Sequence, residues 1–399
     1  MNRAQVAASF MRERGQAADC IDASVALEIL DKEISDGLEG RGGLPMRPAF
    51  IGPVRSIGRE YDCVAVDIGG TVLRVAEVHV FPDGSQELKN VRTRPVPGLE
   101  SGIDEAAFFH EIAEFAEIRK TRMPVAVSFS HDMESVPGPD AKMLGWSKEL
   151  KIRNMTGATV AGALRMASGM PGLKIAVVND SVAATLGCPA GEGSNSMGVI
   201  VGTGFNICCP FRTAEITKLE PGNYGEWMIV NTEIGASRAF PKGKYDSMVI
   251  LSSTDPELFH AEKQCSGRYL QEIIALALAD AREHGLIQKD YTRMTLREMS
   301  GLTTIQNGDD GLAGAIVCEA KKRSAEIAAI CTAALAKRMK SQSLHVMTEG
   351  SVINRMPGYR SLYEKRLREL TGSQINLYSA DNACLRGAAR IIAEGQLER

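Results

Sequence analysis

Asn179 and Asp180 are well placed for acid–base chemistry, because they directly follow an apolar run at residues 174–178. The run predicts a buried strand, and a carboxylate at the carboxyl end of such a strand faces the crevice in which α/β proteins bind ligands. From there Asp180 can act as a general base that accepts a hydroxyl proton, while Asn179 holds the substrate. The competing interpretation is that these residues and Ser181 cap a helix, because Asp and Ser are favoured capping residues.

A strand–turn–strand pattern surrounds Asp67. Apolar residues run up to Asp67 and resume after Arg74, which predicts two antiparallel strands joined by a tight turn. Gly69 and Gly70 in this turn permit positive φ angles and the close approach of another group. The N–H groups of the turn and the hydroxyl of Thr71 can bind phosphate oxygens, and Asp67 can reach a magnesium ion directly or through water. A hairpin without a ligand is the alternative, because short motifs often match by chance.

A second strand–turn–strand pattern, at residues 197–209, contains Gly202, Thr203, Gly204 and Asn206. The shared plan suggests two related α/β halves, each of which contributes one phosphate loop. Two such loops can face one polyphosphate from opposite sides of a cleft. That arrangement suits transfer of a γ-phosphoryl group, because positioning and charge neutralisation supply most of the catalysis. The chain has no Gly-x-x-x-x-Gly-Lys-Ser/Thr motif, which argues against a P-loop enzyme.

Composition narrows the class of protein. A length of 399 residues predicts two domains, and a net charge of −3 without a basic, aromatic-rich run argues against binding to nucleic acid or to an anionic membrane surface. The nine cysteines form no paired motif, which favours reduced thiols, a cytoplasmic location and no zinc site. The N-terminus has no apolar run long enough for a signal peptide or a membrane span.

The other elements follow from periodicity. A short buried strand is expected at residues 125–129, followed by a polar loop at 130–151, and another loop is expected at 92–102. Several polar or aromatic residues outside the glycine turns each have an ordinary structural interpretation when taken singly, as packing, solvated charge or satisfaction of backbone groups. They are Trp146, Lys148, Asn206, Glu233 and Glu262.

Taken in chain order, these segments resemble the motifs of the eukaryotic-type hexokinases, within the actin-like ATPase superfamily. The resemblance covers nearly the whole chain, and it is strong because many short motifs occur in one order at compatible spacing. The matching segments are residues 42–48, 67–74, 128–130, 146–148, 178–180, 202–206, 231–236, 262–270 and 349–351.

The resemblance implies a two-domain α/β protein with the actin-like ATPase (ribonuclease H-like) fold and a sugar and ATP cleft between the domains. The small domain would comprise residues 62–178 and 380–399, and the large domain residues 1–61 and 179–379. The implied cofactors are ATP and Mg²⁺, and the implied activity is phosphorylation of the 6-hydroxyl of a hexose, with glucose as the first candidate. Closure of the domains on the sugar would complete the site only when the correct acceptor is present.

The resemblance also implies a role for each matching residue. Asp180 and Lys148 would be catalytic, Asp180 by deprotonating the 6-hydroxyl. The implied sugar-binding residues are Ser128, Ser147, Lys148, Asn179, Asp180, Asn206, Glu233 and Glu262. The implied residues for ATP are Asp67, Gly69, Gly70, Thr71, Arg74, Gly202, Thr203, Gly204, Gly350 and Ser351, with Asp67 also holding the magnesium ion.

Four departures from the family pattern keep other functions open. Val72 replaces the usual Asn, Ser130 the usual Pro and Ile234 the usual Trp, and residues 381–387 replace a glycine-rich turn. A sugar-binding sensor or regulator with little turnover is therefore one alternative, and a kinase for mannose, fructose or an amino sugar is another. The bacterial glucokinases with a structural zinc are excluded because their clustered cysteines are missing. A single unit without a duplicated half suggests a monomer or homodimer.

Overall fold

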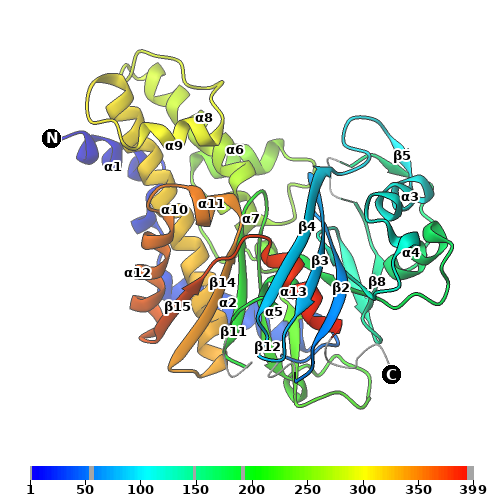
Figure 1. Ribbon diagram of the computed structural model, residues 1–399. Coiled ribbons are helices and arrows are strands. Elements are labelled where there is room, and N and C mark those ends of the chain that lie inside the picture. Colours follow the sequence, from blue (N-terminus) through cyan, green and yellow to red (C-terminus); the bar gives the residue numbers. More distant parts are fainter. Residues whose placement is uncertain (1, 54–57, 147–149, 190–193, 393–399) are drawn as a thin grey trace.

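The computed structural model describes residues 2–53, 58–146, 150–189 and 194–392. Figure 1 shows two sheets side by side, each flanked by helices. The five-stranded sheet, with its strands in the order β10–β6–β2–β3–β4, lies on the right of that view. Its strands are β2 (Tyr61–Ile68), β3 (Val72–Val80), β4 (Gln86–Pro95), β6 (Val125–Phe129) and β10 (Ile175–Asn179).

The six-stranded sheet has its strands in the order β1–β13–β12–β11–β14–β15. They are β1 (Arg47–Pro48), β11 (Ser196–Val201), β12 (Phe205–Arg212), β13 (Trp227–Asn231), β14 (Ser343–Glu349) and β15 (Gln374–Tyr378).

The two sheets share one plan. In each, an antiparallel meander of three strands is extended by two strands parallel to the first strand of the meander. The expected pair of related α/β halves is therefore confirmed, because the strand order and directions repeat even though the residues do not.

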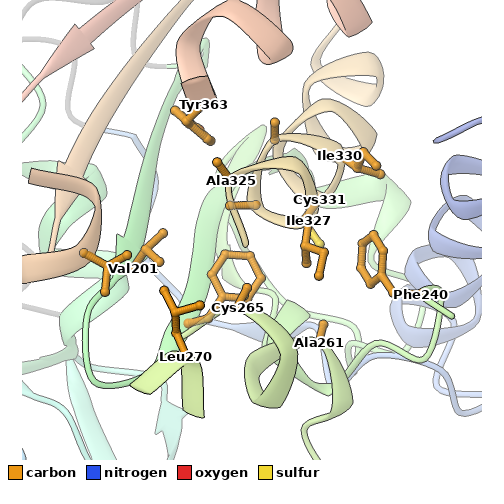
Figure 2. Packing of buried hydrophobic residues seen from close by; sticks show 14 of the residues in the cluster. Val201, Phe240, Ala261, Cys265, Leu270, Ala325, Ile327, Ile330, Cys331 and Tyr363 are labelled. Atoms are coloured by element: carbon orange, nitrogen blue, oxygen red, sulfur yellow. The ribbon is translucent and has the colours of Figure 1, made fainter. Parts of the chain in front are cut away.

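Helices cover the outer faces of both sheets. α3 (Glu105–Phe115) and α4 (Val160–Ser168) pack on the five-stranded sheet, through side chains such as Phe108 and Ile112 that are fully buried. The long helix α10 (Gly308–Met339) lies behind the six-stranded sheet, and Figure 2 shows Ile327 and Ile330 of this helix among the surrounding apolar side chains. The remaining helices of this part are α1 (Arg3–Glu13), α2 (Ala23–Leu38), α6 (Lys244–Ser252), α7 (His260–Cys265), α8 (Gly267–Glu283), α9 (Leu296–Leu302), α11 (Ser351–Arg355) and α12 (Tyr359–Thr371).

Two helices from distant parts of the chain fill the space between the sheets (Figure 1). They are α5 (Asp180–Leu186) and α13 (Ala383–Ile391). Their apolar side chains join one buried cluster with residues of both sheets, such as Ala126 and Ile229. The helices touch closely: a Cβ atom on Gly387 would lie 1.7 Å from the carbonyl oxygen of Ala183. The helix that begins at Asp180 is therefore closely packed against α13, which holds this residue in place.

Two expected loops contain strands. The prediction of a loop at 92–102 is wrong for its first residues, because β4 continues to Pro95. This edge strand carries polar side chains on both faces, so its sequence lacks the alternation of apolar and polar residues that would have indicated a strand. The polar loop expected at 130–151 contains a hairpin of β7 (Met133–Val136) and β8 (Asp140–Met143), anchored by the buried Met133 and Ala141. The short elements that remain are β5 (Ile103–Asp104), β9 (Ile152–Arg153) and the 3-10 helices η1 (Ala18–Cys20), η2 (Ile118–Lys120), η3 (Thr213–Glu215) and η4 (Ile234–Ala236).

No helix within the described residues combines the length and the apolar character needed to cross a membrane.

Candidate active site

A cleft of about 530 Å³ lies between the two sheets. Both glycine turns line it, together with the end of β10 and the segments 130–132 and 145–146. Most of the residues expected at the site line this cleft: Asp67, Gly69, Gly70, Thr71, Arg74, Asn179, Asp180, Gly202, Thr203, Gly204, Asn206, Glu233, Glu262 and Gly350.

Two of the expected residues do not line the cleft, and two others lie outside the described residues. Ser128 is fully buried on β6, where it is the register partner of Asp67 on β2, and it is not among the residues that line the cleft. Ser351 is exposed at the start of α11, and it does not line the cleft either. Ser147 and Lys148 lie outside the described residues.

Asp180 is half-buried where β10 passes into α5. Burial raises the pKa of its carboxyl group to about 7, and the neighbouring carboxylates of Asp67 and Glu233 act in the same direction. A hydrogen bond from the hydroxyl of Ser130 opposes the shift because it favours the ionised form. A carboxylate that titrates near neutral pH is suited to accept and release a proton.

Asn179 is the residue that caps α5. Its Oδ1 accepts a hydrogen bond of 3.0 Å from the backbone N–H of Ser181, and its Nδ2 donates to the carbonyl oxygen of Phe129 at 3.4 Å. The capping interpretation is therefore confirmed for Asn179. Because this amide satisfies the helix terminus and is joined to β6, it also fixes the direction in which the neighbouring Asp180 enters the cleft.

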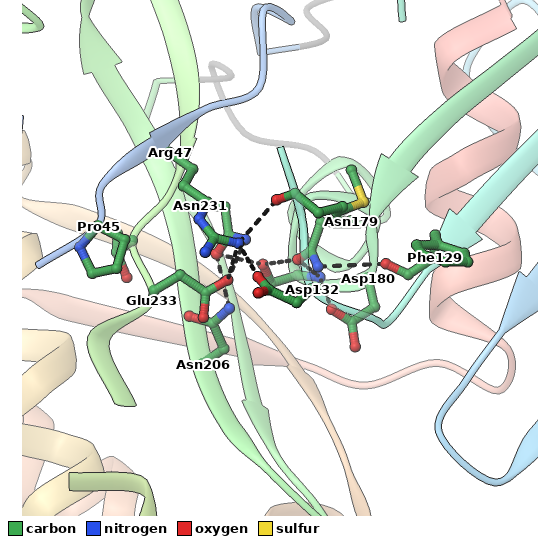
Figure 3. Close-up of polar contacts among 12 residues, drawn as sticks. Pro45, Arg47, Phe129, Asp132, Asn179, Asp180, Asn206, Asn231 and Glu233 are labelled. Atoms are coloured by element: carbon green, nitrogen blue, oxygen red, sulfur yellow. Dashed lines mark hydrogen bonds and ion pairs between the residues drawn. The ribbon is translucent and has the colours of Figure 1, made fainter. Parts of the chain in front are cut away.

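A chain of amides and carboxylates forms one wall of the cleft (Figure 3). Asn206 Nδ2 donates to Asn231 Oδ1 at 2.8 Å, and Asn231 Nδ2 donates to Glu233 Oε1, also at 2.8 Å. Burial raises the pKa of Glu233, while the nearby Arg47 lowers it. Such a row of oriented donors and acceptors matches the hydroxyl groups of a polyol better than an apolar ligand.

Glu262 reaches the same wall from α7. Its Oε2 accepts a hydrogen bond of 2.9 Å from the backbone N–H of Phe205, directly after the second glycine turn. The carboxylate fits there because Gly204 has no side chain: a Cβ atom at that position would lie 2.9 Å from Glu262 Oε2. Gly204 therefore leaves room for the carboxylate of Glu262, which a side chain at this position would have to displace.

The first glycine turn presents a charged pair to the cleft. Arg74 Nη1 donates to Asp67 Oδ2 at 2.9 Å, and this cation lowers the pKa of a carboxyl group that burial raises. Neither Gly69 nor Gly70 uses the positive φ that a glycine permits. Gly69 instead provides room for its own turn, since its Cβ atom would lie 2.9 Å from the carbonyl oxygen of Val72.

The donors around Asp67 fit a divalent cation that arrives with phosphate. Burial raises the pKa of both Asp180 and Glu349, and the Asp67 carboxylate adds to each shift, so it lies close enough to repel both groups. Among the described residues there is no group of three or more acidic, histidine or cysteine side chains that could hold a metal by itself. Mg²⁺ commonly uses one or two carboxylates and takes its other ligands from substrate phosphates and water.

The second glycine turn packs directly against the turn after β14. Gly350 has a φ of +106°, and its Cβ atom would lie 2.4 Å from the carbonyl oxygen of Val201. Cys384 lines the cleft where the family has its glycine-rich turn, and its Sγ lies 3.7 Å from the carbonyl oxygen of Asp180. The thiol therefore lies at the edge of the cleft, next to the backbone of Asp180.

Several residues that line the cleft had no site role assigned to them from the sequence. His131, for which sequence reasoning gave no function, is buried beside Phe129 and Trp146, with ring centroids 4.9 and 5.2 Å apart, and burial lowers its pKa to about 4. Trp146 also packs on Phe108, so its packing interpretation is confirmed although it lines the cleft as well. Asp132 was missed too, and no local pattern in the sequence distinguishes it.

An acceptor hydroxyl beside Asp180 would face both glycine turns, so the fold and the site define a kinase of small hydroxylated molecules. Two family models, both described as hexokinase, match the chain, one at residues 23–189 and the other at residues 196–310 and 287–394. The chain belongs to the hexokinase family. It is therefore a hexose-phosphorylating enzyme, and ATP as the phosphoryl donor follows from the family.

Individual relatives agree with this assignment. Hexokinase-1 of Schizosaccharomyces pombe is 26% identical over 398 residues, which cover 87% of this chain and 82% of that protein. Hexokinase-1 of Saccharomyces cerevisiae is 26% identical over 420 residues, which cover 90% of this chain and 86% of that protein. The solved structure of a Schistosoma mansoni hexokinase complexed with glucose has a TM-score of 0.82 at 19% identity, and the match covers 98% of this chain and 100% of that one. At that identity the structural likeness supports the fold.

Proposed function

We propose that this hexokinase transfers the γ-phosphoryl group of ATP to the 6-hydroxyl of glucose, with Asp180 as the general base. The observation that carries the proposal is the carboxyl group of Asp180, whose pKa is raised to about 7 between two glycine turns and a row of amide and carboxylate groups. A base with this pKa is ionised in a large fraction of molecules at neutral pH and still accepts a proton readily.

The wall of polar side chains supports a sugar as the acceptor. Asn206, Glu233 and Glu262 would each bind a ring hydroxyl, and the resemblance to the family assigns Ser147 and Lys148 to the sugar as well. A buried polar group left without a partner costs about 1–3 kcal/mol, so a sugar with one inverted hydroxyl would bind more weakly. The sugar-bound relative from Schistosoma mansoni supports glucose as the first candidate.

The other end of the cleft supports binding of ATP with magnesium. Thr71, Arg74 and Thr203 would contact the phosphates, and Asp67 would help to hold Mg²⁺, which supplies charge neutralisation when bound. Arg74 can turn from Asp67 toward a phosphate oxygen, because the guanidinium favours phosphate as much as carboxylate.

Closure would involve the two parts expected from the sequence, residues 62–178 with 380–399 against residues 1–61 with 179–379. The packing of α13 on β2, β3 and β6 supports the inclusion of the C-terminal segment with the five-stranded sheet. Closure matters because water also carries a hydroxyl and would otherwise compete for the phosphoryl group. The nine cysteines, all of them free, support a reducing compartment such as the cytoplasm.

The test is a coupled assay of ADP release with ATP and Mg²⁺ across glucose, mannose, fructose, glucosamine and N-acetylglucosamine. We expect turnover with glucose, and loss of at least about 10²-fold in kcat in Asp180→Asn with glucose affinity retained by calorimetry. Phosphorylation of another hexose in preference to glucose would refute the assignment of glucose. Glucose binding without turnover of any hexose would refute the catalytic proposal and favour a sugar sensor.

A further inference from the structure

Arg47 contacts two residues that line the cleft, Asp132 and Glu233, which follow strands of different sheets (Figure 3). It is the first residue of β1, at the edge of the six-stranded sheet. Its guanidinium forms an ion pair with Asp132, which follows β6 of the other sheet, and Nη1 donates to the carbonyl oxygen of Met133 at 2.9 Å. The same Nη1 lies 3.8 Å from Oε1 of Glu233. One cation therefore contacts both sides of the cleft.

The backbone beneath Arg47 is held firmly. Arg47 is the register partner of Asn231 on β13, and the N–H of Met46 donates to the carbonyl oxygen of Thr232 at 3.3 Å. The ammonium of Lys218 donates to the carbonyl oxygen of Pro45 at 2.6 Å. The backbone of Arg47 is thus paired with β13, the strand that ends just before Glu233. This pairing fixes the position from which the Arg47 side chain extends.

Asp132 connects Arg47 to the segment that leads to Trp146 on the other side of the cleft. Its carbonyl oxygen accepts hydrogen bonds from the N–H groups of Leu144 and Gly145, at 2.8 and 3.3 Å. Those residues directly precede Trp146, which lines the cleft. The ends of the segment 132–146 are therefore joined, and Arg47 holds that segment by its first two residues.

Arg47 contacts only one of the two carboxylate oxygens of Glu233, Oε1. Asn231 Nδ2 and Arg47 Nη1 both approach Oε1, and neither contact uses Oε2. The side chain of Arg47 is 24% exposed and that of Asp132 is 50% exposed, so their ion pair contributes little to the stability of the fold. Because Arg47 also contacts Glu233 in the polar wall of the cleft, its position suggests a role in ligand binding.

We propose that Arg47 is a positioning residue that links the sugar ligand Glu233 to the 132–146 segment and holds that segment at the cleft. The inference rests on the proposed function, because it takes Glu233 as a ligand of the sugar. A sugar hydroxyl on Oε2 would fix Glu233, and the guanidinium of Arg47, which already contacts Glu233, Asp132 and Met133, would then hold the 132–146 segment beside the bound sugar. Arg47 itself touches neither the reacting hydroxyl nor the phosphate.

The test compares Arg47→Gln, Asp132→Asn and the double variant. Glucose Kd is measured by calorimetry, and kcat and KM are measured by ADP release. We expect Arg47→Gln to raise both Kd and KM for glucose about tenfold, a typical size for coupling between sites, while kcat changes less than about threefold. The KM for ATP stays unchanged. Asp132→Asn raises the glucose Kd less, and the effects of the two changes are not additive because they break one network.

Arg212→Gln is the matched control. Arg212 is an exposed arginine at the far end of β12, paired with Glu226, and its loss leaves the glucose Kd unchanged. Arg47→Lys restores part of the affinity, because an ammonium keeps the charge but cannot bridge the same partners.

Three results would overturn the inference: an unchanged glucose Kd in Arg47→Gln, fully additive effects in the double variant, or an equal effect of Arg212→Gln. Failure of the proposed function has a different signature. In that case the unaltered protein phosphorylates no hexose, whereas failure of the inference leaves an active protein whose sugar affinity does not depend on Arg47.

Discussion

Removal of the Ser130 hydroxyl provides a sharp test of Asp180 as the base. This hydroxyl donates to the Asp180 carboxylate and favours its ionised form, so Ser130→Ala raises the pKa of Asp180 above its value of about 7. The backbone is not expected to move, because the N–H of Ser130 still donates to the carbonyl oxygen of Ile68 at 3.0 Å. The substitution therefore changes the acidity of Asp180 without removing its carboxylate.

The size of the effect follows from the energy of one hydrogen bond. A bond to a charged group contributes about 1.5 kcal/mol at the lower end, which corresponds to about a tenfold change in the acid dissociation constant. The ionised fraction of Asp180 at pH 7 then falls from about one half to about one tenth, and kcat/KM for glucose falls about fivefold. At pH 9 Asp180 is largely ionised in both proteins, so the two rates converge.

The assay is the pH dependence of kcat/KM for glucose between pH 5.5 and 9, which reports the ionisation of the free enzyme. In the unaltered protein the rate rises with pH through about 7, because the base acts only when it is deprotonated. Ser135→Ala, on the neighbouring hairpin, is the control and leaves the profile in place. A flat profile from pH 6 to 8, or an equal loss at every pH in Ser130→Ala, would refute the assignment of Asp180.

Three further substitutions test the geometry of the cleft. The pKa of Asp180 is raised on folding from an ordinary value of about 3.9, so ionisation destabilises the native state as pH rises from about 4 through 7. Asp180→Asn should therefore increase the free energy of unfolding at pH 8 by about 1–2 kcal/mol and have no such effect at pH 4, as measured by urea denaturation; equal stability at pH 8 would contradict this. Gly204→Ala places a methyl group 2.9 Å from Glu262 Oε2, which must then shift, and should raise the KM for glucose about tenfold with little change in the KM for ATP; an unchanged glucose KM would argue against Glu262 as a sugar ligand. Gly350→Ala imposes a strained φ and a contact with the carbonyl of Val201, so we expect a loss of about 2–3 kcal/mol in thermal unfolding and a higher KM for ATP, and unchanged values of both would be inconsistent with the observed turn.

The parts of the site that could be predicted from the sequence are those determined by a few neighbouring residues. An apolar run that ends in Asp67 or in Asn179-Asp180 identifies a buried strand and the polar residue at its end, and the glycines identify both turns. The order of these motifs along the chain then identified the family, which brought in Glu233 and Glu262. The fold followed, because two copies of one strand plan can be recognised from their two turns.

The parts that could not be predicted depend on contacts between distant residues. Arg47 and Asp132 are 85 positions apart, and nothing near either residue indicates that they meet. Ser128 lies in a strand buried on both sides, so sequence position alone could not reveal that it does not line the cleft. The departure at residues 381–387 was visible as a changed motif, but only the packing of α13 shows that Cys384 lines the cleft beside Asp180.

The packing of α5 against α13 has a consequence for the synthesis of the chain. About 200 residues separate the two helices, and at about 5–20 residues per second a ribosome needs about 10–40 s to make them. During that time the apolar faces of α5 and of both sheets that α13 covers have no partner. A nascent chain that already contains both glycine turns and Asp180 would thus still lack the helix that holds the two sheets together, and we expect it to bind no sugar until α13 has been translated.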